Sequence, residues 1–188
     1  RGDLVKFSPQ TIPDVLLIEP VIHRDERGYF VETFKQKLLD EALGYQVNFI
    51  QDNESKSTSK GVLRGLHYQL PPYTQNKLVR VIEGEVLDVA VDIRRNSPTF
   101  GKHVSVVLSE KNKKQLFVPG GFAHGFIVLS DGAIFAYKVD AYYSSEHEEG
   151  IAYNDKEIDI DWHFLEKEII LSKADQNYSN LSDNKKLV

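Results

Sequence analysis

The sequence contains no cysteine, which excludes disulfides, thiolate catalysis and metal centres built on cysteine ligands. It has no excess of positive charge: 28 acidic against 23 basic residues give a net charge of −5, the wrong sign for sequence-general binding to nucleic acid. No apolar run approaches the roughly 20 residues that a membrane span needs. No signal-peptide pattern precedes the first strand-like segment. We therefore expect a cytoplasmic protein that binds neither nucleic acid nor a membrane.

The sequence does contain a succession of short strand-like segments. Runs rich in Val, Ile, Leu, Phe and Tyr predict strands over 46–52, 62–69, 77–83, 85–93, 103–109, 115–118, 123–129 and 133–140. One helix is expected near 35–43, with Gly44 as its C-cap. Because no long helices alternate with the strands, an antiparallel sandwich or barrel is favoured. We expect one domain over residues 1–188, with residues 1–11 as an N-terminal arm and the polar residues 170–188 as a tail on or near the site.

The first candidate for chemistry is the segment from Arg64 to Gln69, which contains His67. Strict alternation would put Arg64 and His67 on opposite faces of a strand, but Gly65 between them could form a bulge that brings both to one side. His67 would then be available as a base. The alternative is a core histidine bonded to a carbonyl, and on this segment alone that interpretation is favoured.

Three other segments combine polar and apolar residues in ways that allow either a site or a structural role. His124 stands among glycines and shares a face with Phe126; a site and a structural turn are equally consistent with this pattern. Asp88 lies inside an apolar strand and needs a partner such as His67 or Arg64. Tyr137 could donate a proton into a pocket or simply satisfy one buried hydrogen bond.

A catalytic metal is not expected. His67 and His124, with Glu85 or Asp88, are candidate ligands, but no H-x-H or H-E-x-x-H pattern or other close histidine pair is present. No glycine-rich nucleotide loop of the Rossmann or P-loop type is present either. The residues alone therefore leave the chemistry open.

Taken together, the segments resemble the dTDP-4-dehydrorhamnose 3,5-epimerase family over most of the chain, from about Ile12 to Asp175. The matching motifs are, in order, Asp25-Glu26-Arg27-Gly28-Tyr29-Phe30, Gln51-Asp52-Asn53, Gly61-Val62-Leu63-Arg64-Gly65-Leu66-His67-Tyr68-Gln69, Lys77-Leu78-Val79-Arg80, Asp88-Val89-Ala90-Val91-Asp92-Ile93-Arg94, Ser97-Pro98-Thr99-Phe100-Gly101, Gly121-Phe122-Ala123-His124-Gly125-Phe126, Tyr137-Lys138, Tyr142-Tyr143 and Asp159-Ile160-Asp161-Trp162. Their shared order is far more specific than any one of them.

The resemblance implies a cupin-type jelly-roll β-sandwich with one or a few short helices, a homodimer, and an isomerase that needs no metal or other cofactor. The substrate would be dTDP-4-dehydro-6-deoxy-D-glucose, and the product dTDP-4-dehydro-L-rhamnose. The alternatives are an epimerase that acts at one centre only, a metal-dependent cupin oxygenase, and a non-catalytic sugar-nucleotide binding protein.

The resemblance also assigns roles to residues. His67 would be the base, supported by Asp88 and Asp175; Tyr137 would return a proton from the opposite face, and Lys77 would stabilise the enolate. Substrate-binding positions are implied at Arg27, Tyr29, Glu32, Gln51, Asp52, Asn53, Arg64, Lys77, His124, Tyr143 and Glu148. Family members often carry Lys directly before the final Asp, whereas this sequence has Ala174 there.

Overall fold

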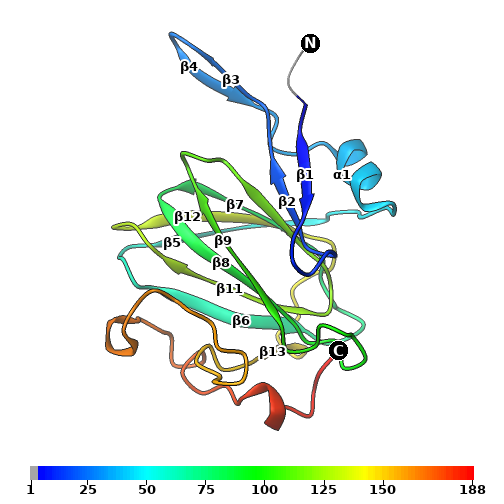
Figure 1. The fold of residues 1–188 in the computed structure, drawn as a ribbon, viewed down its shortest axis with the longest axis vertical. Helices are drawn as coiled ribbons and strands as arrows, with labels where there is room; N and C mark the ends of the chain where they lie inside the picture. Colours follow the sequence, from blue (N-terminus) through cyan, green and yellow to red (C-terminus); the bar gives the residue numbers. More distant parts are fainter. Residues whose placement is uncertain (1–3) are drawn as a thin grey trace.

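The computed structural model describes residues 4–188 and consists mainly of two facing antiparallel sheets (Figure 1). The six-stranded sheet has the order β1 (Lys6–Pro9), β2 (Leu16–Glu19), β10 (Gln115–Val118), β7 (Lys77–Glu83), β12 (Ala133–Val139), β5 (Gln51–Ser57). The five-stranded sheet has the order β13 (Glu148–Gly150), β6 (Leu63–Gln69), β11 (Phe122–Val128), β8 (Glu85–Asp92), β9 (His103–Ser109). The predicted all-β sandwich is confirmed.

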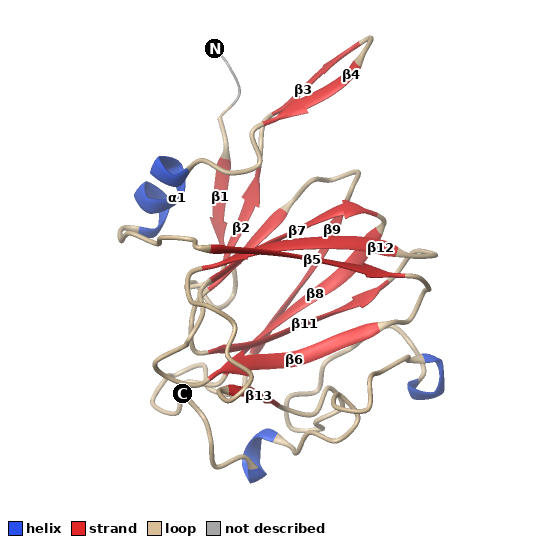
Figure 2. Cartoon of the chain, turned by 180° about the vertical axis from the view of Figure 1, so that it is seen from behind, coloured by secondary structure: helices blue, strands red, loops and turns tan. Residues whose placement is uncertain are grey.

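Strands β8 and β11 of the five-stranded sheet are buried on both faces, apart from Glu85 at the start of β8. Val86 and Ala90 of β8 pack into the core between the sheets, whereas Leu87, Val89 and Val91 pack beneath the C-terminal segment. Every residue of β11 is buried, including His124. The C-terminal residues supply the second cover with two 3-10 turns, at Glu166–Glu168 and Leu181–Asp183, and otherwise irregular chain (Figure 2).

The single α-helix among residues 4–188, α1 (Gln36–Leu43), follows the sequence expectation closely. Its buried Leu39 joins Leu16, Ile18, Leu78 and Phe117 in a third apolar cluster on the six-stranded sheet. Gly44 ends the helix in the left-handed conformation, with φ 77°, and its amide donates to the carbonyl of Asp40. None of the described helices is long and apolar enough to span a membrane.

A two-stranded hairpin, β3 (Ile22–Asp25) and β4 (Gly28–Val31), projects away from the sandwich (Figure 1). Its tip is the turn at 25–28, and its Tyr29 and Phe30 are exposed by 55% and 65%. Exposed aromatic side chains on a projecting element mark a surface that can bind a partner.

Two sequence expectations differ from the structure in their bounds. The strand expected at 46–52 begins at Gln51 and runs to Ser57, because its inward side chains are polar and give no apolar signal. Of the expected N-terminal arm, residues 1–3 lie outside the described residues, and Lys6–Pro9 form the edge strand β1. Residues 170–188 contact the rest of the chain through apolar side chains and through hydrogen bonds of Asp175 and Leu181.

Candidate active site

A cavity of about 630 Å³ lies between the two sheets at the end where β5, β6, β7, β11 and β12 meet the tail. Most of the predicted site residues line it. They are Asn53, Arg64, His67, Lys77, His124, Tyr137, Tyr143, Glu148 and Asp175. The volume is in the range of pockets that bind small molecules. We call this space the cavity.

His67 and Asp175 form a hydrogen-bonded pair on the cavity wall. Nε2 of His67 lies 2.6 Å from Oδ1 of Asp175, and the backbone N–H of Gly65 donates to Oδ2 at 3.2 Å. Burial raises the pKa of Asp175, but the bonds from His67 and Gly65 outweigh this effect and hold that pKa below its ordinary value of 3.8. The carboxylate is therefore ionised, so Nε2 of His67 carries a proton and Nδ1 is left with the lone pair.

Two facing glycines allow β6 to present both Arg64 and His67 to the cavity. Gly65 has φ 131°, and a Cβ on it would lie 2.7 Å from the Cα of Gly125 on β11. The register between the strands shifts here, from His67 opposite His124 to Arg64 opposite Phe126. This irregularity at Gly65 is the one that the sequence suggested as a way to bring Arg64 and His67 to one side.

Arg64 is held at the cavity by two hydrogen bonds to β5. Its Nε donates to Oγ of Ser57 at 3.2 Å, and its Nη2 donates to the carbonyl of Lys56 at 3.1 Å. These contacts fix the planar guanidinium at the cavity rim while the residue remains exposed. A fixed guanidinium is well suited to bind phosphate oxygens.

His124 and Asp88 form a second pair, which is fully enclosed. Nε2 of His124 lies 2.8 Å from Oδ1 of Asp88, and the side chains are 6% and 0% exposed. The expected contact of Asp88 with His67 or Arg64 is therefore wrong. Asp88 lies on β8, which neighbours β11 and not β6, so β11 supplies its partner.

The environment of Asp88 is the reverse of that of Asp175. Burial raises the pKa of Asp88, and the neighbouring His124 and Lys77 offset this only in part. Its Oδ2 is buried and has no hydrogen-bond partner among the described residues. Lys77 on β7 is buried as well, and desolvation lowers its pKa to about 8 although Asp88 and Glu148 act in the opposite direction.

Tyr137 enters the cavity from β12, on the six-stranded sheet, whereas His67 enters from the five-stranded sheet. Burial raises the pKa of its hydroxyl, which keeps Tyr137 protonated, and Asn53 opposite it on β5 weakens that shift. Nζ of Lys77 lies 5.8 Å from the centre of the Tyr137 ring. A proton donor, a cation and a histidine base thus surround one space.

The cavity mouth is formed by aromatic and acidic side chains. The hydroxyl of Tyr143 donates to Oε2 of Glu148 at 2.8 Å, and Gln51 accepts from the backbone N–H of Tyr143 at 3.1 Å. Gln51 also donates to Asn53 at 2.9 Å, so it supports cavity residues without lining the cavity itself. Tyr178 lines the cavity from the tail and was missed by the sequence analysis, because nothing in an irregular polar segment marks it.

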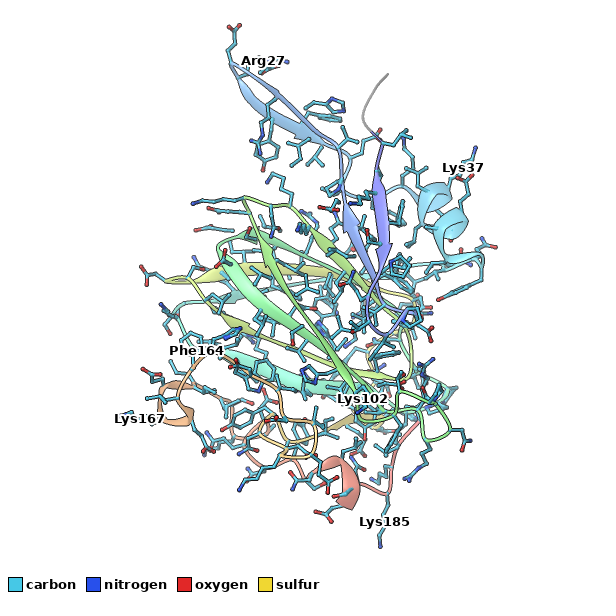
Figure 3. All side chains as sticks on the ribbon, viewed as in Figure 1. Arg27, Lys37, Lys102, Phe164, Lys167 and Lys185 are labelled. Atoms are coloured by element: carbon cyan, nitrogen blue, oxygen red, sulfur yellow. The ribbon has the colours of Figure 1, made fainter. Side chains whose placement is uncertain are left out.

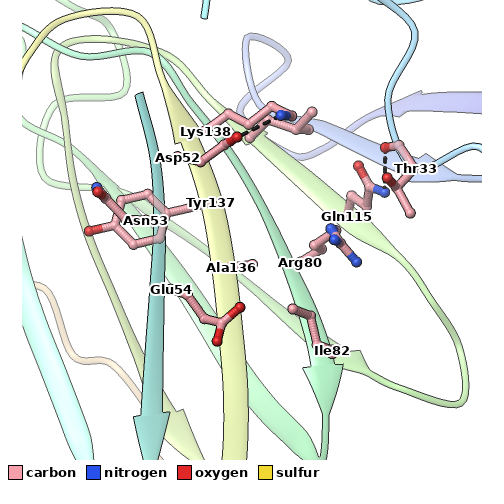
Figure 4. A pocket seen from close by; sticks show the side chains of 11 residues that line it. Thr33, Asp52, Asn53, Glu54, Arg80, Ile82, Gln115, Ala136, Tyr137 and Lys138 are labelled. Carbon is pink, nitrogen blue, oxygen red and sulfur yellow. Dashed lines mark hydrogen bonds and ion pairs between the residues drawn. The ribbon is translucent and has the colours of Figure 1, made fainter. Parts of the chain in front are cut away.

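Besides Gln51, four predicted binding residues lie outside the cavity of this chain. Arg27 stands at the tip of the hairpin (Figure 3), paired with Asp25, and Tyr29 and Glu32 follow it. Asp52 is directed away from Asn53 by strand alternation and pairs with Lys138 at 3.0 Å. That pair borders a second cavity of about 270 Å³, which also contains Glu54 and Arg80 (Figure 4).

Among residues 4–188, no three His, Asp or Glu side chains converge in a way that could hold a metal ion. In each histidine of the cavity, Nε2 is engaged by an aspartate. The arrangement can remove a proton from a carbon beside a carbonyl group, hold the resulting negative charge near Lys77, and return a proton from Tyr137.

Residues 9–183 match the family model described as dTDP-4-dehydrorhamnose 3,5-epimerase. The dTDP-4-dehydrorhamnose 3,5-epimerase of Shigella flexneri is 63% identical over 151 residues, which are 80% of this chain and 83% of the relative. The solved dTDP-6-deoxy-D-glucose-3,5-epimerase of Legionella pneumophila, in complex with dTDP-4-keto-L-rhamnose, is 49% identical. It has a TM-score of 0.91 and covers 96% of this chain and 94% of that one.

A more distant solved structure differs in its described activity. The 3'-monoepimerase of Streptomyces bikiniensis, in complex with dTDP-quinovose, is 31% identical with a TM-score of 0.85, covering 93% of this chain and 87% of that one. Together these likenesses confirm the expected cupin-type jelly-roll fold.

Proposed function

This chain belongs to the dTDP-4-dehydrorhamnose 3,5-epimerase family, and from that premise we propose that His67 and Asp175 form the base of its reaction. The enzyme is an isomerase that inverts C3 and C5 of dTDP-4-dehydro-6-deoxy-D-glucose and yields dTDP-4-dehydro-L-rhamnose. Its expected setting is the cytoplasm. The single observation that carries the assignment of the base is the 2.6 Å bond between Nε2 of His67 and the ionised Asp175, which leaves Nδ1 able to accept a proton.

The chemistry follows from the C4 ketone of the substrate. Removal of the proton at C3 or C5 leaves an enolate, whose negative charge is spread onto the C4 oxygen. Nδ1 of His67 takes the proton, and Asp175 stabilises the imidazolium that forms. Lys77 supplies a fixed positive charge for the enolate oxygen, with His124 beside it. Tyr137 returns a proton from the opposite wall, which inverts the carbon centre.

Arg64 is proposed to bind the diphosphate, because its guanidinium is fixed at the cavity rim. Asn53, Tyr143 and Glu148 are proposed to contact the sugar or the base, since all three line the cavity. Ala174 also lines it, so a lysine contact of the kind often found in the family at this position is absent from this chain.

Proton NMR of dTDP-4-dehydro-6-deoxyglucose incubated with the protein in D2O tests the function. Loss of both the C3 and the C5 signals, with new couplings for the L-sugar, is the expected result. Loss at one carbon only would identify an epimerase of the single-centre kind. No exchange from folded protein would leave a non-catalytic binding protein or a metal-dependent cupin oxygenase, which elemental analysis would distinguish.

The substitution Tyr137→Phe tests the proposed acid. It removes the hydroxyl and keeps the ring, so solvent deuterium should still enter at C3 and C5 while inversion is impaired. NMR of the recovered sugar separates the two outcomes, because exchange with retention and exchange with inversion give different couplings. Normal inversion by this variant would show that Tyr137 is not the acid.

The hairpin residues are explained by a homodimer in which each hairpin reaches the cavity of the other copy. Arg27 projects away from the sandwich (Figure 3), and Tyr29 and Glu32 also lie outside the cavity of their own chain. All three are exposed, which leaves them free to contact a second copy. Arg27 of one copy and Arg64 of the other would then hold one diphosphate together.

Mixing two variants tests this arrangement. Arg27→Ala should bind substrate weakly and His67→Ala should not react, but a mixed dimer contains one cavity with His67 and an intact hairpin. Subunit exchange between them should restore about a quarter of the wild-type activity at low substrate concentration. No recovery from a mixture that forms mixed dimers would contradict the arrangement.

A further inference from the structure

Tyr178 stands against the ring of His67, although no motif of the sequence marks it. The two ring centres are 5.9 Å apart and the ring planes meet at 74°, which is the edge-to-face arrangement that aromatic rings prefer. Tyr178 lies three residues after Asp175 in the same tail, so one short segment supplies both neighbours of the imidazole. Asp175 holds Nε2 of His67, and the Tyr178 ring faces the imidazole at an angle.

The Tyr178 ring occupies a place that only a glycine opposite it allows. Gly150 of β13 pairs with His67 of β6, and a Cβ on Gly150 would lie 2.5 Å from two carbons of the Tyr178 ring. A side chain at Gly150 would therefore displace the ring. The Tyr178 ring is thus seated on the backbone of β13, beside the strand that carries the base.

The tail holds Tyr178 from both sides. Before it, Asp175 is bonded to His67 and to the backbone N–H of Gly65. After it, the carbonyl of Ser179 accepts from the N–H of Ala152 at 2.9 Å, and the N–H of Leu181 donates to Asp155 at 2.7 Å. The ring is consequently not a loose surface side chain but part of a fixed wall.

We propose that Tyr178 is a positioning residue, whose ring keeps the His67 imidazole turned so that Nε2 stays on Asp175 and Nδ1 stays available to the substrate. The proposal rests on the proposed function of His67 as the base. It assigns the effect to the ring and not to the hydroxyl, because the ring meets the imidazole. Small displacements of a catalytic group strongly reduce the rate, since proton transfer requires close alignment.

The test compares Tyr178→Ala with Tyr178→Phe, using the rate of deuterium incorporation from D2O at C3 and C5. For Tyr178→Ala, kcat should fall by about tenfold to a hundredfold with KM within about twofold, because the base is misplaced and substrate contacts remain. Tyr178→Phe should keep most of the wild-type kcat, because it retains the ring. Tyr73→Ala is the matched control, since Tyr73 makes a similar ring contact with His147, at 4.7 Å, outside the cavity.

Gly150→Ala provides a test that leaves Tyr178 itself unchanged. It should lower kcat because the new methyl group displaces the ring, and in combination with Tyr178→Ala it should add little further loss. If Tyr178→Ala fails to fold, Tyr178→Leu takes its place, since leucine fills the space without a planar ring and should also lower kcat.

Several outcomes would overturn the proposal. They are a normal kcat in Tyr178→Ala or Tyr178→Leu, an equal loss in Tyr178→Phe, and a raised KM with unchanged kcat, which would make Tyr178 a substrate contact. Wild-type protein without any exchange would instead contradict the proposed function, so the two failures are distinguishable.

Discussion

The two histidine–aspartate pairs contain the same groups in opposite environments. His67 and His124 face each other across neighbouring strands, and each gives Nε2 to a carboxylate. The His67 side chain is 31% exposed, and both oxygens of Asp175 accept a hydrogen bond. The pair of His124 and Asp88 is enclosed, and one oxygen of Asp88 has no partner among residues 4–188.

Under the proposed function, this difference separates the base, His67, from a supporting residue, His124. Asp175 stays ionised, so it can stabilise a positive charge that forms on His67 when a proton arrives from the substrate. Burial raises the pKa of Asp88 and so favours its neutral form, whereas the neighbouring Lys77 and His124 favour its charged form. A hydrogen bond between histidine and aspartate does not by itself identify a catalytic pair; Asp175 differs from Asp88 in its ionisation and in its place on the cavity wall.

The largest contrast is expected from removing each histidine. His67→Ala should lower the rate of C–H exchange by about 10³- to 10⁴-fold, because the general base is lost. His124→Ala should lower it by no more than about 10²-fold, since it removes support for the enolate but keeps the base. Exchange measured by NMR and dTDP binding measured by calorimetry check this, and binding should change little in His67→Ala. Near-normal exchange in that variant would overturn the assignment.

Replacing Asp175 should reduce kcat more than replacing Asp88 does. Asp175→Asn should reduce kcat by about 10²-fold or more, because an amide can donate to Nε2 and move the proton of His67 onto Nδ1, where it blocks the base. Asp88→Asn should cost about tenfold at most, since the buried carboxylate lies outside the cavity. Steady-state kinetics of the two variants at one pH decides the matter. A larger loss in Asp88→Asn would mean that the enclosed pair holds the base.

The charge on Lys77 should make the activity depend on pH. This charge and that of ionised Asp88 stabilise each other. With a pKa of about 8, Lys77 is charged below that pH, so activity should fall as pH rises through about 8. Lys77→Arg should abolish this alkaline limb, since arginine stays charged. Lys77→Met should lose about 10²-fold in kcat yet gain up to about 3 kcal/mol in free energy of unfolding near pH 7, because a buried charge is removed. Rate profiles against pH and urea unfolding measure both effects.

Much of this site is predictable from local sequence, but its pairings are not. The strand-like segments around Arg64 and His124 predict strands that carry these side chains, as β6 and β11 do. Alternation does not reveal which strand lies beside β8, so the partner of Asp88 was assigned wrongly. That choice depends on sheet order, which is a long-range property of the chain.

Other parts of the site leave no periodic signal. The inward residues of β5 are polar because they border the cavity, so the strand was expected too early in the chain. Tyr178 lies in an irregular tail, where position is fixed by single hydrogen bonds and not by a repeating pattern. The sequence of the hairpin does not indicate that Arg27 lies outside the cavity of its own chain.

The smallest predicted effects are changes in the stability of the fold. They separate the two aspartates most clearly, because the contributions of Asp175 and Asp88 to stability change with pH in opposite directions. The folded pKa of Asp175 is below 3.8, so its contribution to stability is present above that pH and is lost as pH falls through the folded pKa. The folded pKa of Asp88 is above 3.8, so its contribution decreases as pH rises from 3.8 through the folded pKa.

At pH 7, Asp175→Asn should therefore lower Tm by about 3–8 °C, and the difference from the wild type should shrink toward pH 3. Asp88→Asn should leave Tm unchanged or raise it by about 2–4 °C at pH 7, and this gain should also disappear in acid. Thermal unfolding at a series of pH values measures both. Parallel curves for the two variants would mean that the carboxylates share one environment, and the distinction between the pair of His67 and Asp175 and the pair of His124 and Asp88 would fail.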